Sequence, residues 1–134
     1  MARKRLPPND PREWLNRAQS NLARSQNPVP GAYLEDACFD AQQAAEKAIK
    51  AVFLAFGLTF PFVHDLGRLL TVLAQAGVRV PKYVAEADRL TRFAVDARYP
   101  GLSSPVTNPE HRRAVRIATG VVRWATRHVN RQSP

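Results

Sequence analysis

Arg98 is the side chain whose setting best suits chemistry. It follows a stretch of helically spaced apolar residues and precedes Tyr99, Pro100 and a glycine. The residue before a proline avoids the helical region, so the helix should stop here and hold a guanidinium on a turn. Such a group can clamp a phosphate with two hydrogen bonds. The alternative is that Arg98 bonds the carbonyls at the end of its own helix or pairs with Asp96. We name Arg98 and Tyr99 as candidate ligand-binding residues.

His64 is a second candidate for ligand binding, because it stands before Asp65 where a new helix is expected to begin. The backbone N–H groups at a helix start favour an anion. The structural alternative is a helix cap or an interhelical hydrogen bond, and Asp65 could equally be the cap. His64 has no second histidine, cysteine or carboxylate at a metal-binding spacing. We therefore expect no metal site.

The net charge of +9 is concentrated at the two ends of the chain. Residues 31 to 108 carry eight basic and eight acidic side chains, so the excess comes from the segments on either side. If the first and last helices lie side by side, they form one positive face that attracts RNA, DNA or an acidic protein. A solvated arginine-rich surface is the alternative. The candidate cations are a ridge on the last helix and two lysines on the second helix: Arg112, Arg116, Arg123, Arg127 and Arg131, with Lys47 and Lys50.

Composition disfavours several classes of protein. Cys38 is the only cysteine, which excludes an internal disulfide or a thiolate zinc site, and its place among alanines fits a small buried hydrophobe. No uncharged run approaches the roughly 18 apolar residues of a membrane span, and no apolar secretory segment follows the basic N-terminus. Glycine-rich phosphate loops and Ser/His/Asp arrangements are not apparent. We expect a cytoplasmic protein with no cofactor.

The chain of 134 residues fits one domain. Residues 1–10 predict a flexible basic leader, and residues 11–130 predict a helical domain in which no strand shows two-residue alternation. Because the connections are short, we expect an all-α, up-and-down bundle of four to five helices. Start and stop signals place the helices from Pro11 to about Ser25, Ala32 to Phe56, about Leu66 to Gly77, Pro81 to just before Tyr99, and Thr107 to Val129.

The second predicted helix has apolar residues on two sides. Its alanines let a neighbouring helix approach closely, whereas Phe39, Ile49 and Phe53 form a second stripe that one partner helix cannot cover. This pattern indicates a central helix, or one shared with a second subunit in a homodimer. On the same helix Gln42, Glu46 and Lys50 fall four apart and can link through their side chains.

Three segments, taken in order, resemble a known family: AQQAAEKAIKA at 41–51, His64-Asp65-Leu66, and Ala97-Arg98-Tyr99-Pro100. The chain resembles the small single-domain prokaryotic type of the HEPN family (higher eukaryotes and prokaryotes nucleotide-binding) from about Arg12 to Val129. The resemblance implies a helical fold, a homodimer, and a nucleotide or RNA as ligand. It also implies a separately encoded minimal nucleotidyltransferase as partner, in a toxin–antitoxin-like pair.

Catalytic HEPN proteins resemble one another in a short motif, an arginine and a histidine separated by four to six residues, which acts on RNA without a metal at a dimer interface. Arg123 and His128 match this motif. The histidine would move the proton of a ribose hydroxyl while the arginine neutralises charge on the phosphate. In a continuous helix residues five apart point about 140° apart, so both reach one phosphate only if the helix breaks or a second subunit supplies one of them. The sequence thus leaves three functions open: a binding protein, a ribonuclease toxin using this pair, and a structural dimer with a basic surface.

Overall fold

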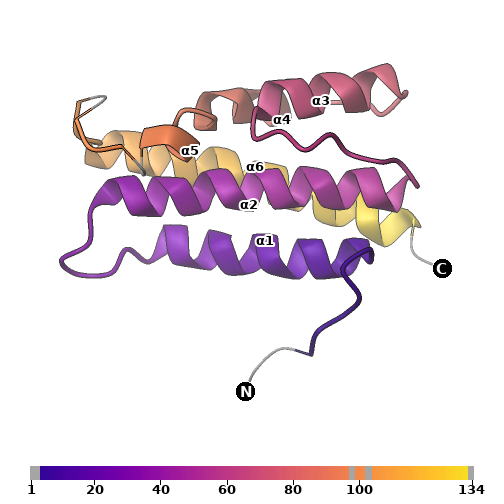
Figure 1. The fold of residues 1–134 in the computed structure, drawn as a ribbon, viewed down its shortest axis with the longest axis horizontal. Helices are drawn as coiled ribbons and strands as arrows, with labels where there is room; N and C mark the ends of the chain where they lie inside the picture. Colours follow the sequence, from indigo (N-terminus) through magenta and orange to yellow (C-terminus); the bar gives the residue numbers. More distant parts are fainter. Residues whose placement is uncertain (1–3, 97–98, 102–103, 133–134) are drawn as a thin grey trace.

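Residues 4–96, 99–101 and 104–132, which the computed structural model describes, contain only helical regular structure. They form α1 (Pro11–Gln26), α2 (Leu34–Ala55), α3 (Leu66–Gln75), α4 (Lys82–Ala85), the 3-10 helix η1 (Glu86–Leu90), α5 (Phe93–Asp96) and α6 (Asn108–Gln132). The predicted all-α bundle is confirmed. Figure 1 shows α1 on one side, α2 and α6 in the middle, and α3 to α5 on the other side. No helix in the described ranges is both long enough and apolar enough to cross a membrane.

The predicted starts of α1, α3 and α6 are confirmed by side-chain caps. Helix α2 begins at Leu34, two residues later than predicted, and neither α2 nor α4 has a side-chain cap. The Asp10 side chain accepts a backbone hydrogen bond of 2.9 Å in the first turn of α1, and Asp65 does the same at 3.1 Å for α3. Thr107 and Glu110 form the expected capping box, each side chain accepting from the other's backbone N–H, at 3.0 and 3.3 Å. These starts were predictable because each depends on a side chain and the backbone of the next few residues.

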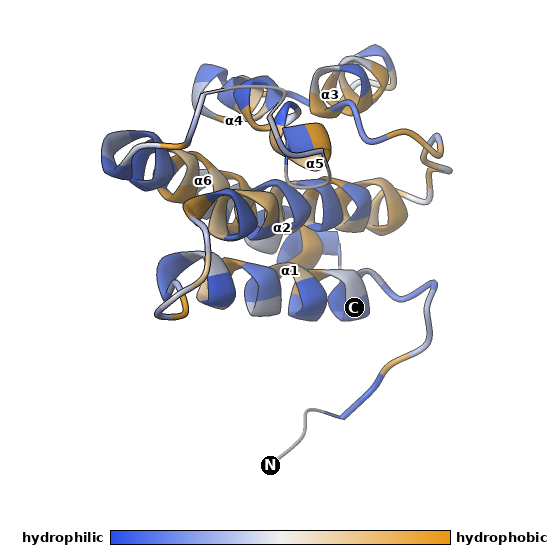
Figure 2. Cartoon of the chain, turned by 60° about the vertical axis from the view of Figure 1, so that its left-hand side comes forward, coloured by the Kyte–Doolittle hydropathy of each residue, from blue (hydrophilic) through white to orange (hydrophobic). Residues whose placement is uncertain are grey.

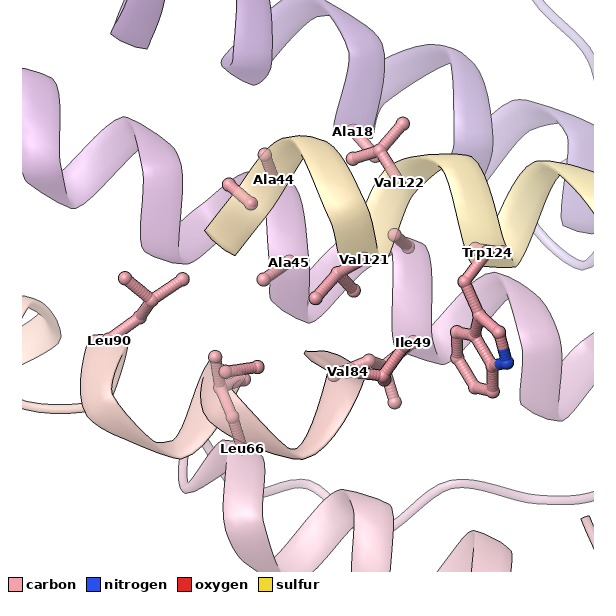
Figure 3. Packing of buried hydrophobic residues seen from close by; sticks show 14 of the residues in the cluster. Ala18, Ala44, Ala45, Ile49, Leu66, Val84, Leu90, Val121, Val122 and Trp124 are labelled. Carbon is pink, nitrogen blue, oxygen red and sulfur yellow. The ribbon is translucent and has the colours of Figure 1, made fainter. Parts of the chain in front are cut away.

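Helix α2 is the central helix of the bundle. Fourteen of its 22 residues are buried, and α1, α6 and the α3-to-α5 layer of the same chain pack around it. Figure 3 shows Ala44 and Ala45 where helix α2 meets Ala18 of α1 and Val121 of α6, which is where small side chains permit a close approach. The second apolar stripe of α2 is therefore covered largely by this chain itself, without a second subunit.

The hydropathy of the surface follows from this layering. In Figure 2 the apolar residues lie mainly between the layers, while the outward sides of α1, α3 and α6 are largely hydrophilic. Buried residues from all layers form one cluster, so the helices share a single core.

The loop 57–65 runs back along α2 instead of leading to an antiparallel neighbour (Figure 1). Gly57 begins it with φ +70°, a left-handed conformation that ends α2. Further along the loop His64 lies 3.0 Å from Glu46, some ten residues back along the helix, which corresponds to about 15 Å. Helix α3 therefore starts beside the middle of α2 and runs in the same direction as α2.

The fourth predicted helix is divided into α4, η1 and α5, although no glycine or proline lies between residues 82 and 96. Its buried residues are spaced three apart in the sequence: Val84, Ala87, Leu90 and Phe93. A spacing of three fits the three residues per turn of a 3-10 helix better than the 3.6 of an α-helix. At the break the Thr91 hydroxyl accepts the Leu66 N–H at 3.1 Å, which satisfies a backbone donor in the first turn of α3.

Ala45→Leu tests the close packing of α2. Ala45 is fully buried, so its neighbours must make room for the larger side chain, and we expect a loss of about 1–3 kcal/mol in the free energy of unfolding. Ala23→Leu on the exposed side of α1 is the control and should change it by no more than about 0.5 kcal/mol. Urea unfolding followed by circular dichroism measures both. Equal midpoints for the two variants would show that this side of α2 is loosely packed.

Candidate anion-binding groove

A hollow of about 400 Å³ between α1 and α2 is bordered by five basic side chains and one carboxylate. Two neighbouring hollows of about 420 and 410 Å³ share residues with it, and Lys47 lines all three. We call the three together the α1–α2 groove. The charged residues of its central hollow are Lys4, Arg5, Arg17, Arg24, Lys47 and Glu13.

Lys47 is half-buried at the centre of this groove. Its Nζ donates to Asn21 Oδ1 at 2.7 Å, and Asn21 in turn donates to Asp40 at 3.0 Å. Arg24 lies 3.4 Å from the other oxygen of Asp40. Burial lowers the pKa of Lys47, and repulsion from Arg17 lowers it further. A bound anion would stabilise the charged form of Lys47 and so offset both effects, and the position therefore favours a negatively charged ligand.

The one carboxylate in the central hollow is already neutralised. Glu13 accepts from Arg17 Nε at 2.7 Å and from the Leu6 N–H at 3.0 Å. The Leu6 hydrogen bond, with that from Arg17, holds the pKa of Glu13 below its usual value. The Trp14 indole also donates to the Pro8 carbonyl at 2.6 Å. The described part of the predicted leader is therefore attached to α1, which places Lys4 and Arg5 at the groove.

The candidates Lys50 and His64 meet at Glu46, a carboxylate inside the bundle. Lys50 Nζ lies 3.0 Å from Glu46 Oε2, Gln42 donates to Oε1 at 3.0 Å, and His64 Nδ1 lies 3.0 Å from Oε1. Burial alone raises the pKa of Glu46, but hydrogen bonds from His64, Gln42 and Lys50 outweigh it and leave the pKa below its usual value. Lys50 is buried and its charge is neutralised by Glu46, whereas the His64 side chain is 62% exposed.

Arg123 and His128 do not converge within one protomer. Helix α6 is continuous through both and ends only at Gln132. Arg123 is exposed, whereas the His128 ring packs against Trp124 at 5.0 Å and against Phe56 at 5.5 Å. Burial lowers the pKa of His128, and the charges of Arg131 and Arg127 contribute. Of the other candidates, Arg98 lies outside the described residues, Tyr99 is 57% exposed, and Arg116 is exposed on α6.

The basic side chains occupy two surfaces instead of the single face that the sequence suggested. Helices α1 and α6 do touch, since His111 lies 2.7 Å from the Ser25 carbonyl. On α6, however, Arg127 donates to Tyr83 of α4 at 2.6 Å, and the Tyr83 ring lies over Gly120. Arg113 of α6 borders a second, smaller hollow of about 100 Å³ with Arg89 and Arg92. Arg17 and Arg24 of α1 border the groove with α2, whereas Arg127 and Arg113 of α6 face α4 and η1.

Cys38 lies away from the surface of the molecule. Cys38 is fully buried, and burial raises the pKa of its thiol to about 12, so it stays protonated at neutral pH. Within the ranges that the structure describes, no three His, Cys, Asp or Glu side chains are grouped to hold a metal ion.

Comparison with known proteins decides the family. The family model for the HEPN domain matches residues 11–129. The chain belongs to the HEPN family. The structure is similar to the crystal structure of TT1696 from Thermus thermophilus, with 33% identity and a TM-score of 0.78 over 90% of this chain and 98% of that one. It shares the fold of ST0689, an archaeal HEPN homologue, with 24% identity and a TM-score of 0.72 over 90% of this chain and 98% of that one. A search of curated proteins gave no match.

Of the basic residues of this HEPN protein that border the groove, Lys47 was named from the sequence, whereas Arg17 and Arg24 were not. A signal was present: Arg17, Asn21 and Arg24 have the spacing of one face of a helix. Asp40 and Lys47 are likewise seven apart on α2. What the sequence did not show was that these two polar stripes face each other.

Glu46→Gln tests the buried network of this HEPN protein. Removing the carboxylate leaves Lys50 buried without its counter-ion, so at about pH 7 we expect a loss of about 3 kcal/mol in unfolding free energy. The folded pKa of Glu46 is depressed from its ordinary 4.5, so its contribution is present above that value and is lost as the pH falls through the lower folded pKa. The difference in unfolding free energy between the wild type and the variant should therefore be smaller at an acid pH well below 4.5 than at pH 7.

Glu86→Gln on the exposed side of η1 is the matched control and should leave the unfolding free energy nearly unchanged at both pH values. Urea unfolding at each pH measures the difference. A Glu46→Gln penalty that stayed constant with pH would contradict the assignment of this carboxylate as ionised in the folded protein.

Proposed function

We propose that this HEPN protein binds a phosphate-bearing ligand, a nucleotide or RNA, in the α1–α2 groove. The observation that carries the proposal is Lys47, a half-buried cation with a lowered pKa where three hollows join. Its hydrogen bond to Asn21 uses one of the three N–H groups of an ammonium, which leaves two for a ligand. Phosphate oxygens accept such charge-assisted hydrogen bonds well.

The size of the groove supports a nucleotide or a strand over a simple anion. Each of its three hollows measures about 400 Å³, within the range of small-molecule sites, and the cations are spread along them. Arg24 borders two of the hollows and Arg17 borders two, with Lys47 common to all. Such spacing suits several phosphates or a phosphate joined to a larger group. The HEPN family is in general related to nucleotides and RNA, which agrees with this choice.

The proposal extends to a homodimer and to a minimal nucleotidyltransferase as partner, in a cytoplasmic toxin–antitoxin-like pair. Membership of the HEPN family supports the pairing. Two apolar side chains at the turn between α1 and α2, Val29 and Tyr33, are 69% and 77% exposed at one end of the groove, and a second copy could cover them there. The hollow beside Arg89 and Arg113 lies in the other outer layer and remains available to a different protein. Co-purification with the product of an adjoining nucleotidyltransferase gene tests the pairing.

Lys47→Met tests the groove. Loss of a charge-assisted hydrogen bond should weaken binding of inorganic tripolyphosphate and of a labelled oligouridylate by about tenfold to a hundredfold. The variant should also show a shallower dependence of affinity on salt, because one phosphate contact is gone. Isothermal titration calorimetry and fluorescence anisotropy measure the two ligands.

Lys82→Met, which removes the same charge from an exposed site on α4, is the matched control and should bind like the wild type. An equal loss in both lysine variants would show that only the overall charge matters, and the groove would no longer explain binding.

A ribonuclease toxin using Arg123 and His128 is the second candidate function. The specific observation in its favour is that burial lowers the pKa of His128, which keeps the ring neutral near pH 7, as a general base requires. Because α6 is continuous, a second copy must supply the arginine that meets each His128.

Under this alternative, wild-type protein expressed in cells slows growth and degrades RNA, whereas His128→Ala and Arg123→Ala each restore growth and intact RNA. Gel analysis of total RNA with growth curves measures this. Sedimentation of the purified protein should then show a dimer. Intact RNA and equal growth in all three strains would eliminate the ribonuclease function.

A further inference from the structure

An aromatic side chain on the loop 57–65 is almost entirely uncovered. Phe62 is 93% exposed, and its ring makes a T-shaped contact with Phe60, with centroids 5.9 Å apart. Phe60 in turn meets Trp14 at 5.2 Å, and Trp14 borders the same hollow as Arg17 and Lys47. A row of three aromatic rings therefore runs from the α1–α2 groove out to Phe62.

The loop holds Phe62 in a defined position. At its start the Leu58 N–H donates to the Phe53 carbonyl at 2.8 Å, and near its end His64 is bonded to Glu46 at 3.0 Å. Between them Val63 donates to the Pro61 carbonyl at 3.0 Å, which closes a tight turn around Phe62. These hydrogen bonds hold the backbone around Phe62 in place. Binding of a ligand to Phe62 would therefore cost little conformational entropy of the loop.

We infer that Phe62 is a stacking platform for a base of single-stranded nucleic acid whose phosphates lie in the α1–α2 groove. This inference rests on the proposed function and adds the class of ligand. Cationic grooves flanked by aromatic side chains bind single strands without sequence preference, because every base offers a π face. Bases inside a duplex are stacked on one another and are not offered to such a ring.

The surroundings of Phe62 favour a nucleic acid over a protein partner. Protein docking surfaces present contiguous apolar patches of several hundred Å². Here the fully exposed neighbours in the loop are polar, namely Thr59, His64 and Asp65, whereas the apolar Pro61 and Val63 on either side of Phe62 are half-buried. The other apolar ring within reach, Phe60, is half-buried and has Lys50 Nζ 5.0 Å from its centroid. One projecting ring beside a basic groove matches a single base better than an apolar side chain from a protein.

The experiment compares Phe62→Ala, Phe62→Leu and Phe62→Trp in the full chain, with Val95→Ala as the matched control. Val95 is an apolar residue of α5, 48% exposed, in the other outer layer. Fluorescence anisotropy with a labelled oligouridylate should show Phe62→Ala and Phe62→Leu weakened by between about fivefold and 150-fold. Phe62→Trp and Val95→Ala should bind like the wild type or, for tryptophan, more tightly. A duplex of the same length should bind equally to all variants.

Inorganic tripolyphosphate separates this inference from the function on which it rests, because it has no base. Its affinity should fall in Lys47→Met and stay unchanged in Phe62→Ala. If Phe62→Ala binds oligouridylate like the wild type while Lys47→Met does not, the groove stands and the platform is overturned. Full binding by Phe62→Leu would show that apolar contact suffices and would also overturn stacking. If tripolyphosphate and oligouridylate both fail to bind the wild type, the proposed function falls and the platform falls with it.

Discussion

The Glu46 carboxylate is the constraint on which the arrangement of this molecule depends. It is buried on an alanine-rich helix, where an isolated charge would cost several kcal/mol, so it must be surrounded by donors. Gln42 and Lys50 supply two of them from the same helix, one turn before and one turn after. The third, His64, comes from the loop 57–65 and requires that loop to double back along α2. This contact, with the packing of Phe60 against Trp14 and Phe53, holds the loop that leads to α3.

Helix α2 performs three tasks on three sides, and its sequence separates them by helical spacing. The alanines, Ala44 and Ala45 among them, allow α1 and α6 to approach closely. Glu46 fixes the returning loop. Lys47, the next residue, points to a different side, toward Asn21 of α1, and centres the groove. Because consecutive residues on a helix differ by about 100°, residues 45, 46 and 47 can serve packing, loop attachment and the proposed binding at once.

The features predicted correctly from the sequence are those that local rules decide. Asp10, Asp65 and Thr107 mark helix starts because a cap involves only the next few residues. The fourth helix was predicted as one piece because Val84, Ala87 and Leu90 suit both a 3-10 helix and an α-helix, and only the buried Phe93 favours the former.

The site was predictable only in part, because it depends on how the helices pair. Lys50 was named as a ligand residue, yet its charge is neutralised inside the bundle by Glu46. The sequence shows that the two residues can pair, but it does not show that the pair is buried. Lys47 has ordinary helical neighbours in sequence, and its importance comes from Arg17 and Arg24, which reach it from another helix. The arrangement of helices also bears on whether the protein only binds RNA or also cleaves it. Phe56, just before the loop of Phe62, packs against His128, so the His128 ring lies close to the start of that loop. Whether cleavage follows depends on a second protomer, because the continuous α6 keeps Arg123 about 140° away from His128 around the helix axis.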